Sequence, residues 1–245
     1  MTYSSKLLLV YNFVKKIITF INYGLETTIK SNLFKILIEI RWIIFLAKDF
    51  KKYGVNENYI ISIASQASRM KTLKWTLKSI ILQSTKPSSI YIWFNKRDFK
   101  KAKCKFCNYK KYGVKIMLAT IDYKSHNKYF YSLKKFSKNG IVTADDDLYY
   151  RKNWLRELIN ANNEVLGQKV IVGHRGVNIH FSEPNKIDLY CLWKKASKTN
   201  SGVTTVLNSG AGILFPPESF TKFDFSLDIS CSYPNLRRIS AFLDP

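Results

Sequence analysis

The sequence predicts an α/β fold with a mostly parallel sheet flanked by helices, preceded by a helical N-terminal extension. From about residue 59 onward, short β-rich runs alternate with helical patterns, which is typical of parallel strands joined by right-handed helical crossovers. The first 57 residues instead indicate two helices, about Lys6–Tyr23 and Thr28–Phe50, with breaks near Gly24 and Gly54. We therefore expect a helical extension over residues 1–57 and one α/β domain over residues 58–245.

The elements of the α/β domain follow one another in order. A β-rich run at Tyr59–Ser65 precedes a helix at Arg69–Gln83, in which five apolar residues share one face: Met70, Leu73, Leu77, Ile80 and Ile81. Further strands are expected at Ser89–Asn95, Val114–Ile121, Gly140–Ala144 and Lys169–Gly173, and further helices near Asn127–Ser137 and Asn153–Val165. Loops are expected around Glu183–Asn185, Thr199–Gly202 and Asn208–Gly212. Open sheets of this kind bind ligands at the carboxyl ends of their strands, so the residues after each strand are the candidates for a site.

Composition and charge indicate a folded, strongly basic protein. The 245 residues are 46% hydrophobic and 15% aromatic, more apolar than a disordered chain. The net charge of +23 is concentrated in the middle: residues 1–58 carry +5, residues 59–135 carry +16 and residues 136–245 carry +2. This clustering favours binding of phosphate groups on a nucleotide, an anionic lipid surface, a charged glycan or nucleic acid. Solvated lysines in a lysine-rich composition are the alternative explanation of the total charge.

Cysteine usage and apolar stretches bear on the compartment. Of four cysteines only Cys104 and Cys107 are close in sequence, which argues against a secreted disulfide framework and against a zinc site. Lysines interrupt the first apolar run and no cleavage site follows it, so we expect no secretory signal. The stretch Leu33–Ala47 is short for a bilayer span and contains charges. It is interpreted as an amphipathic helix that packs on the main domain or lies on a membrane.

Three successive carboxylates, Asp145, Asp146 and Asp147, follow the strand expected at Gly140–Ala144. Like charges this close repel one another and raise one another's pKa, an effect that a divalent cation removes. Carboxylates suit Mg²⁺ or Mn²⁺, which complete their shells with water and a diphosphate. In an extended backbone Asp145 and Asp147 point to one side and Asp146 to the other. Such a run more often marks a solvated turn or a helix start, but its place after an apolar strand favours the metal-binding interpretation.

The stretch Ile141-Val-Thr-Ala-Asp-Asp-Asp-Leu-Tyr-Tyr-Arg-Lys-Asn-Trp-Leu resembles the metal-binding segment, of DxD type, of bacterial family-2-like glycosyltransferases of the Rossmann-like GT-A fold. That family commonly has a proline at the position of Arg151. The start of the fold is similar too, in Ile61-Ser-Ile-Ala-Ser-Gln-Ala-Ser-Arg69, Leu77-Lys-Ser-Ile, Gln83 and Pro87. Three later stretches also resemble the family: Asp122–Lys128, His174-Arg175 and Gly210–Pro217.

The resemblance implies a metal-dependent glycosyltransferase. It implies that Asp145 and Asp147 hold Mn²⁺ or Mg²⁺ and that Gly210 and Gly212 form part of the acceptor wall. The nucleotide-sugar, expected to be a UDP-sugar, would be bound by Ser65, Arg69, Asp122, Lys128, Asp145, Asp146 and Arg175. The sugar would pass, with inversion, to a glycan or lipid-linked acceptor in cell-surface polysaccharide or lipopolysaccharide assembly. We accordingly expect a cytoplasmic protein with peripheral contact to the inner face of the cytoplasmic membrane.

The chain departs from the family after its Pro-Pro segment. Members of the family usually continue with an acidic pair and a tryptophan, where the acceptor-activating base is expected. This chain lacks the pair, and Asp224 and Asp228 are the remaining carboxylates nearby and the candidate bases. A non-catalytic member that binds nucleotide or acceptor for a partner enzyme is therefore a second hypothesis. A nucleic-acid-binding protein, suggested by lysines and aromatic residues in the region 96–112, is a third, but it leaves the aspartates unexplained, so nucleic acid is not the expected partner.

Overall fold

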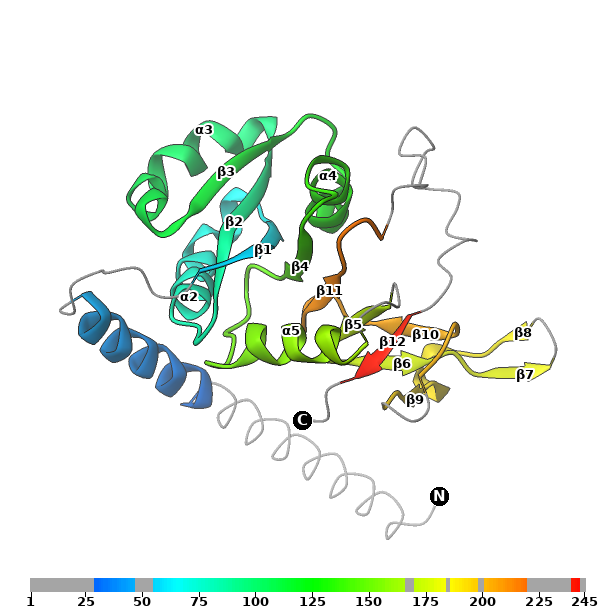
Figure 1. Cartoon of the computed structure of the whole chain (residues 1–245). Coiled ribbons are helices and arrows are strands. Elements are labelled where there is room, and N and C mark those ends of the chain that lie inside the picture. The colour runs from blue at the N-terminus through cyan, green and yellow to red at the C-terminus, as the bar shows by residue number, and fades with distance from the viewer. Residues whose placement is uncertain are drawn as a thin grey trace, which may run out of the picture. The chain divides into compact units, whose positions relative to one another are not determined.

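A computed structural model describes residues 29–46, 55–165, 170–183, 186–197, 201–219 and 239–242 (Figure 1). The chain divides into two compact units, Met1–Asp49 and Phe50–Pro245. The described part of the first unit is one helix over residues 29–46, which matches most of the second expected helix. The first expected helix, Lys6–Tyr23, lies outside the described residues. None of the described helices combines the length and the apolar character that crossing a bilayer requires.

The helix over residues 29–46 carries a continuous stripe of exposed apolar side chains. Seven large apolar residues, each 47–65% exposed, form it: Ile29, Leu33, Ile36, Leu37, Ile40, Ile43 and Ile44. At about 100° of rotation per residue they lie within an arc of about 120°. The charged residues of the helix, Lys30, Lys35, Glu39 and Arg41, fall outside that arc. The helix is therefore amphipathic, and its exposed apolar stripe is bordered mainly by positive charge.

The second unit is built on a seven-stranded sheet with the strand order β12-β5-β11-β4-β1-β2-β3. Its strands are β1 (Val55–Ala64), β2 (Lys86–Asn95), β3 (Val114–Ala119), β4 (Gly140–Ala144), β5 (Ile171–Gly173), β11 (Ile213–Phe215) and β12 (Ile239–Phe242). Strands β3, β2, β1 and β4 are parallel neighbours, and β12 is parallel to β5. Only β11 runs antiparallel to its neighbours β4 and β5. The predicted mostly parallel α/β sheet is confirmed.

Helices connect the parallel strands, and two of the three lie where the sequence predicts them. Helix α2 (Met70–Ile81) joins β1 to β2, α3 (Lys96–Lys105) joins β2 to β3, and α4 (Asn127–Lys135) joins β3 to β4. Figure 1 shows α2 and α3 on one side of these strands and α4 on the other, as right-handed crossovers require when the strand order reverses at β1. Helix α5 (Trp154–Glu164) packs against β5, β11 and β12.

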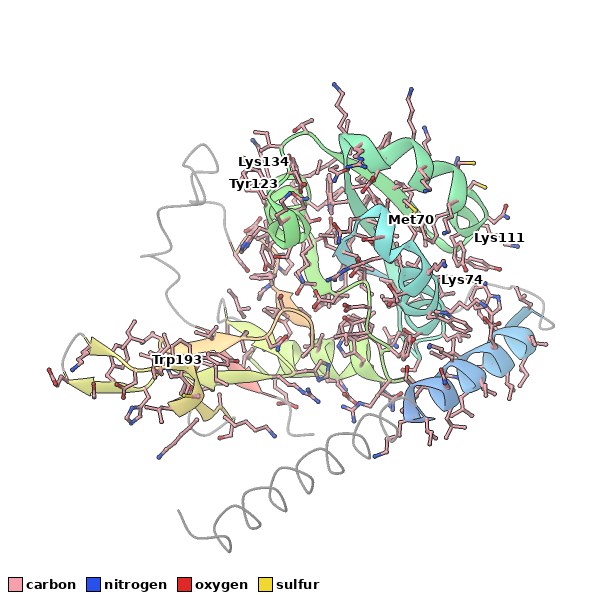
Figure 2. The ribbon with its side chains drawn as sticks, turned by 180° about the vertical axis from the view of Figure 1, so that it is seen from behind. Met70, Lys74, Lys111, Tyr123, Lys134 and Trp193 are labelled. Atoms are coloured by element: carbon pink, nitrogen blue, oxygen red, sulfur yellow. The ribbon has the colours of Figure 1, made fainter. Side chains whose placement is uncertain are left out.

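The core lies between this sheet and its helices. All five residues expected on the inner face of α2 are at most 5% exposed, and Figure 2 shows the first of them, Met70, at the start of that helix. On the α4 side the core contains a small polar cluster. The Trp93 ring nitrogen donates to the Ser132 hydroxyl at 2.8 Å, and the Ser132 and Ser62 hydroxyls are 2.7 Å apart. This cluster fixes α4 against β1 and β2, since buried polar groups are costly unless paired.

Three elements in this half of the sheet, α3, β1 and β2, differ from the sequence-based expectation. Helix α3 was not expected, because its six basic residues obscure a short apolar face; Asn95 caps it by accepting a hydrogen bond from the Asp98 amide at 2.9 Å. Strand β1 begins at Val55, four residues before the expected start, since Val55 and Asn56 pair with Lys86 and Pro87. Strand β2 accordingly begins at Lys86, three residues before the expected start at Ser89, and includes Pro87.

A small antiparallel sheet lies next to β12, the strand at one end of the main sheet. It contains β6 (Gly176–Asn178), β9 (Lys194–Lys195) and β10 (Thr205–Leu207) in the order β10-β6-β9. A hairpin of β7 (Phe181–Glu183) and β8 (Lys186–Ile187) extends from it. Figure 2 shows Trp193, which precedes β9, in this part of the protein, away from the labelled residues of α2 and α4.

Candidate functional site

The carboxyl ends of β1 and β4 lie side by side, which brings the first and fourth expected strands to one edge. Ile63 pairs with Ala144, so the residues that follow the two strands are neighbours. The Ser65 hydroxyl donates to a carboxylate oxygen of Asp146 at 2.6 Å, across 81 residues of sequence. The three aspartates therefore stand at the ligand-binding edge that open sheets of this class share.

Arg69 lies across two of the three aspartates. One guanidinium nitrogen is 3.0 Å from an oxygen of Asp146 and 3.2 Å from an oxygen of Asp147. The side chain of Asp146 is 3% exposed, whereas those of Asp145 and Asp147 are 38% and 44% exposed. The exposures alternate as the sequence-based expectation has it, although β4 ends at Ala144 and Asp146 and Asp147 lie in a bend. The middle carboxylate is buried and its neighbours are partly exposed.

Burial raises the pKa of the Asp146 carboxyl above its ordinary value, because a charge in a poorly solvated place is disfavoured. The hydrogen bonds from Ser65 and Arg69 act in the opposite direction and stabilise the carboxylate. Asp147 contributes a smaller repulsive effect that adds to the rise. Asp146 is thus held in place by the protein, and its neighbours Asp145 and Asp147 offer the accessible carboxylate oxygens.

Lys128 reaches the cluster from the first turn of α4. The residue is 1% exposed, and its ammonium group donates a hydrogen bond to Asp145. A buried lysine is tolerated only when its charge is paired. The Ser62 hydroxyl donates to the Lys128 carbonyl, which anchors that turn of the helix to β1. The chain itself thus supplies part of the positive charge that three adjacent carboxylates need, through Lys128 and Arg69.

Asp122 lies in the loop before α4 and organises it. Its carboxylate accepts hydrogen bonds from the Lys124 amide at 3.0 Å, the Lys124 ammonium at 3.1 Å and the Asn127 side-chain amide at 3.0 Å. Burial tends to raise the pKa of Asp122, but the bonds from Lys124 and Asn127 outweigh it, so the pKa lies below its ordinary value. Asp122 is therefore ionised at neutral pH and keeps Lys124, which has a positive φ of 57°, at the edge of the site.

These residues surround one cavity of about 340 Å³. Six of the seven residues expected at the nucleotide-sugar line it: Ser65, Arg69, Asp122, Lys128, Asp145 and Asp146. Lys124, Ser125 and Asn127, which the sequence analysis did not single out, line it as well. Its charged lining comprises three cations and three carboxylates, with Lys124 as the third cation. The cavity has the size range of small-molecule sites, and its polar groups come from four separate segments of the chain.

The turn at Asn208–Gly212 closes the site on the side of Asp145. A Cβ atom at Gly210 would stand 2.2 Å from an Asp145 carboxylate oxygen, so any other residue there would displace the Asp145 side chain. Gly212 has φ of +113°, and a Cβ there would approach the Trp154 ring to 2.6 Å. Both glycines that the sequence analysis assigned to the acceptor wall are thus required by close packing. Gly210 lies directly against the carboxylate cluster.

Tyr150 and Trp154 hold that turn, and the sequence analysis assigned them no role. The Tyr150 hydroxyl donates to the Gly210 carbonyl at 2.7 Å and accepts from the Asp145 amide at 2.8 Å. The Trp154 ring nitrogen donates to the Ala211 carbonyl at 2.7 Å. Burial raises the pKa of Tyr150, so the phenol stays neutral and can donate. Both residues belong to the segment that carries the family resemblance, and that was the available signal.

Arg175 lines a second cavity of about 470 Å³, on the small sheet, instead of the first. Its neighbour His174 also lines this second cavity, and a ring nitrogen of His174 lies 3.0 Å from the Trp154 carbonyl. Burial lowers the pKa of His174, and the positive charges of Arg151 and Arg175 add to that effect. Hydrogen bonding to Trp154 and the charge of Glu157 oppose it. The imidazole is therefore neutral at neutral pH.

The donor set fits a divalent cation that is shared with a ligand. Within the described ranges, no group of three or more His, Cys, Asp or Glu side chains is arranged to enclose a metal. Asp145 and Asp147 are each more than one third exposed. Mg²⁺ and Mn²⁺ are commonly bound through one or two carboxylates, with waters and phosphate oxygens completing the shell. The residues present therefore suit such an ion only together with a phosphate-bearing ligand.

Among the lysines of α3 and the following turn, Phe106 is buried, whereas Phe99, Tyr109 and Tyr112 are partly exposed. Phe106 is 3% exposed, and its ring lies 5.9 Å from Tyr109, which in turn lies 6.3 Å from Tyr112. Stacking on bases needs accessible aromatic faces. The contacts among Phe106, Tyr109 and Tyr112 cover part of these faces and leave the two tyrosines partly exposed. The two candidate bases, Asp224 and Asp228, lie outside the described residues.

No family model matches the sequence, and no curated protein matches it. Solved structures are similar at low identity. The 4-diphosphocytidyl-2C-methyl-D-erythritol synthase of Anaerococcus prevotii is 12% identical, with 77% of this chain and 90% of that chain covered and a TM-score of 0.47. CMP:2-keto-3-deoxy-manno-octonic acid synthetase with CTP is 8% identical, with 68% and 77% covered and a TM-score of 0.44. The glycosyltransferase GlyE of Streptococcus pneumoniae is 12% identical, with 68% and 36% covered and a TM-score of 0.40. This chain thus spans about a third of the length of GlyE.

Proposed function

We propose that this protein is a metal-dependent, GT-A-like glycosyltransferase that uses a nucleotide-sugar, with a UDP-sugar as the expected donor. One observation carries the proposal. The cavity at the carboxyl ends of β1 and β4 gathers Arg69, Lys128, Asp145 and Asp146 from distant parts of the chain. Asp147 adjoins it through its contact with Arg69. Ion pairs that only stabilise the fold need no cavity beside them. Here a cavity, two partly exposed carboxylates and a wall of glycine residues occur at the same place, which is typical of a ligand-binding site.

The donor would lie in the first cavity, with its diphosphate near Asp145 and Asp147. Asp145 and Asp147 would hold the Mn²⁺ or Mg²⁺ ion, which when bound supplies neutralising charge for the departing nucleoside diphosphate. The protein's own contribution is positioning. Arg69 and Ser65 fix Asp146, and Lys128 orients Asp145. Lys124, whose side chain is 82% exposed, is placed to meet a phosphate at the mouth of the cavity.

In the proposed reaction the bond between the anomeric carbon and the diphosphate breaks, and its electron pair leaves on the diphosphate. An acceptor hydroxyl forms the new bond from the opposite side of the sugar, with inversion, and its proton passes to a base. Asp224 and Asp228 stay the candidate bases. The acceptor would be a glycan or lipid-linked glycan in cell-surface polysaccharide or lipopolysaccharide assembly. The Gly210–Gly212 turn would form its wall.

The donor proposal is tested by thermal unfolding of the full chain with nucleoside diphosphates and sugar nucleotides, each with and without Mn²⁺. A ligand at about 100 times its Kd stabilises the native state by about 2.7 kcal/mol, a rise in Tm of about 5–10 °C for a chain of this size. We expect UDP and UDP-sugars to give this rise with Mn²⁺ and a smaller one without it. Absence of a rise with every nucleotide would overturn the proposal.

Matched variants assign any response to the site. Asp147→Ala removes an accessible carboxylate and is expected to abolish both the Mn²⁺-dependent rise and the turnover of the sugar nucleotide. Glu183→Ala removes an exposed carboxylate of the β7–β8 hairpin and should change neither. If the protein binds the nucleotide but does not turn over the sugar nucleotide with any acceptor, the non-catalytic alternative is favoured. Tight RNA binding with a steep salt dependence and no response to UDP would favour the nucleic-acid alternative.

The proposed location is the cytoplasm, with peripheral contact to the inner face of the cytoplasmic membrane. The exposed stripe on the helix over residues 29–46 supports it, because apolar side chains bordered by cations suit the boundary between anionic headgroups and acyl chains. Sedimentation with vesicles containing phosphatidylglycerol tests this part. Ile36→Glu with Ile40→Glu should release the protein, whereas Lys134→Glu, a single exposed charge on α4, should not. Equal sedimentation of all three proteins would contradict it.

A further inference from the structure

The second cavity, on the small sheet, differs from the first in its charge. Arg175 and Lys195 line it, and no carboxylate does. Within the described part of the chain neither cation takes part in a salt bridge. The first cavity, in contrast, balances three cations with three carboxylates. Among the described residues, the lining of the second cavity therefore carries two cations and no carboxylate, which favours an anionic ligand.

The remaining wall of this cavity suits an organic ligand rather than a bare ion. Val177, Val206 and Leu207 supply apolar surface, and Tyr190, which is 68% exposed, supplies an aromatic ring. His174 adds no charge at neutral pH, since burial lowers its pKa. A cavity of about 470 Å³ with two cations, an aromatic ring and an apolar wall has room for one or two sugar rings with an anionic group.

A single turn separates this cavity from the carboxylate cluster. Asn208 lines the cavity, and its side-chain oxygen accepts from the amides of Gly210 and Ala211 at 3.0 Å and 3.2 Å. The backbone amide of Asn208 donates to the backbone carbonyl of Arg175 at 2.8 Å. Two residues further on, Gly210 lies against Asp145. A ligand in the second cavity therefore lies across this turn from the place proposed for the transferred sugar.

We propose that the second cavity binds the acceptor, and that the acceptor carries a phosphate or carboxylate group held by Arg175 and Lys195. This inference rests on the glycosyl transfer proposed above and names the chemical class of its acceptor. The Arg175 guanidinium can bind such a group through two parallel hydrogen bonds, and the Lys195 ammonium adds a point charge. The role of Arg175 then lies with the acceptor, in contrast to the donor role that the resemblance implied.

The test measures binding of small probes to the full chain by saturation-transfer NMR. The probes are glucose 1-phosphate, glucuronate and farnesyl diphosphate, with glucose as the neutral control. Saturating UDP and Mg²⁺, a diamagnetic ion that leaves the NMR signals sharp, fill the first cavity, so that phosphate-bearing probes report on the second. We expect the anionic probes to bind at least about tenfold more tightly than glucose, the effect of one charge-assisted hydrogen bond. Preference for farnesyl diphosphate would identify a lipid-linked acceptor, and preference for the sugars an anionic glycan; both support the proposal.

Three variants locate the probe site. Arg175→Gln and Lys195→Gln should each weaken anionic probes about tenfold and leave UDP binding unchanged, which also shows that the variants are folded. Lys194→Gln removes a neighbouring exposed charge that does not line the cavity and should have no effect. Equal binding of glucose and the anionic probes, or equal losses in all three variants, would overturn the proposal. Failure of UDP to bind would instead contradict the donor proposal. Probe binding to the second cavity can then be measured in the absence of UDP.

Discussion

Lys128 and Asp145 form an ion pair whose two members differ sharply in exposure. The Lys128 side chain is 2% exposed and the Asp145 side chain 38%. If the lysine is removed, water can solvate the remaining carboxylate. If the aspartate charge is removed, the ammonium group is left in the interior without a counter-ion, which is far more costly. The two halves of the pair therefore make unequal contributions to stability.

Asp145→Asn should destabilise the protein by about 3–5 kcal/mol, the usual cost of an uncompensated buried charge. Lys128→Met, which keeps the side-chain volume, should cost about 2 kcal/mol or less, because the carboxylate left behind is partly solvated. Urea unfolding measures both. Lys124→Met, at a side chain that is 82% exposed, serves as the control and should stay within about 0.5 kcal/mol of the wild type. Equal losses in the first two variants would contradict this account.

Gly210→Ala should damage the site while the fold persists. The added Cβ would stand 2.2 Å from the Asp145 carboxylate, so that side chain must move away from its bond with Lys128. We expect the Mn²⁺-dependent rise in Tm with UDP to disappear, and turnover to fall about 100-fold, the usual effect of a 1 Å misplacement. Gly202→Ala is the matched control, since no atom lies within 4 Å of a Cβ there. Normal UDP binding by Gly210→Ala would show that the position of Asp145 does not matter.

Tyr150→Phe tests the bridge between Asp145 and the Gly210 turn. Loss of the hydroxyl leaves the buried Gly210 carbonyl and the Asp145 amide without their partner, and each such group costs about 1–3 kcal/mol. We expect the free energy of unfolding in urea to fall by about 2–6 kcal/mol, the sum for the two groups, and nucleotide binding to weaken. Tyr112→Phe, at a partly exposed tyrosine of the turn after α3, is the comparison. A Tyr150→Phe protein as stable as that comparison would argue against the bridge.

His174 predicts a pH dependence of stability. Burial lowers the pKa of its imidazole in the folded protein, whereas the unfolded chain binds a proton near pH 6.5. Between these two values the unfolded state holds more protons, so stability falls as the pH drops below about 6.5. Urea unfolding between pH 7.5 and 5.5 should show this fall, and His174→Gln should reduce it. The exposed residue His126 provides the control, as His126→Gln should leave the fall in place; an unchanged slope in His174→Gln would contradict the prediction.

Local pattern was sufficient for most of the sheet and its helices. The strand Gly140–Ala144 has the predicted bounds, and the apolar face of α2 is buried as its spacing indicates. Periodicity reports such elements because burial of one face is a property of neighbouring residues. Helix α3 was not predicted because six of its ten residues are basic, and its few apolar residues do not form a recognisable helical period. Extension of β1 to Val55 depends on its partner β2, which no local pattern contains.

The sequence by itself determined that three carboxylates end a buried strand of a mostly parallel sheet, at the edge where such sheets bind ligands. Only the tertiary structure decided what surrounds them. Arg69 meets Asp146 across 77 residues and Lys128 meets Asp145 across 17, so part of the expected neutralising charge comes from the chain itself. Arg175 joins a different cavity, although the resemblance grouped it with the others. Long-range contacts follow from how strands and helices pack, and side-chain spacing along one segment cannot encode them.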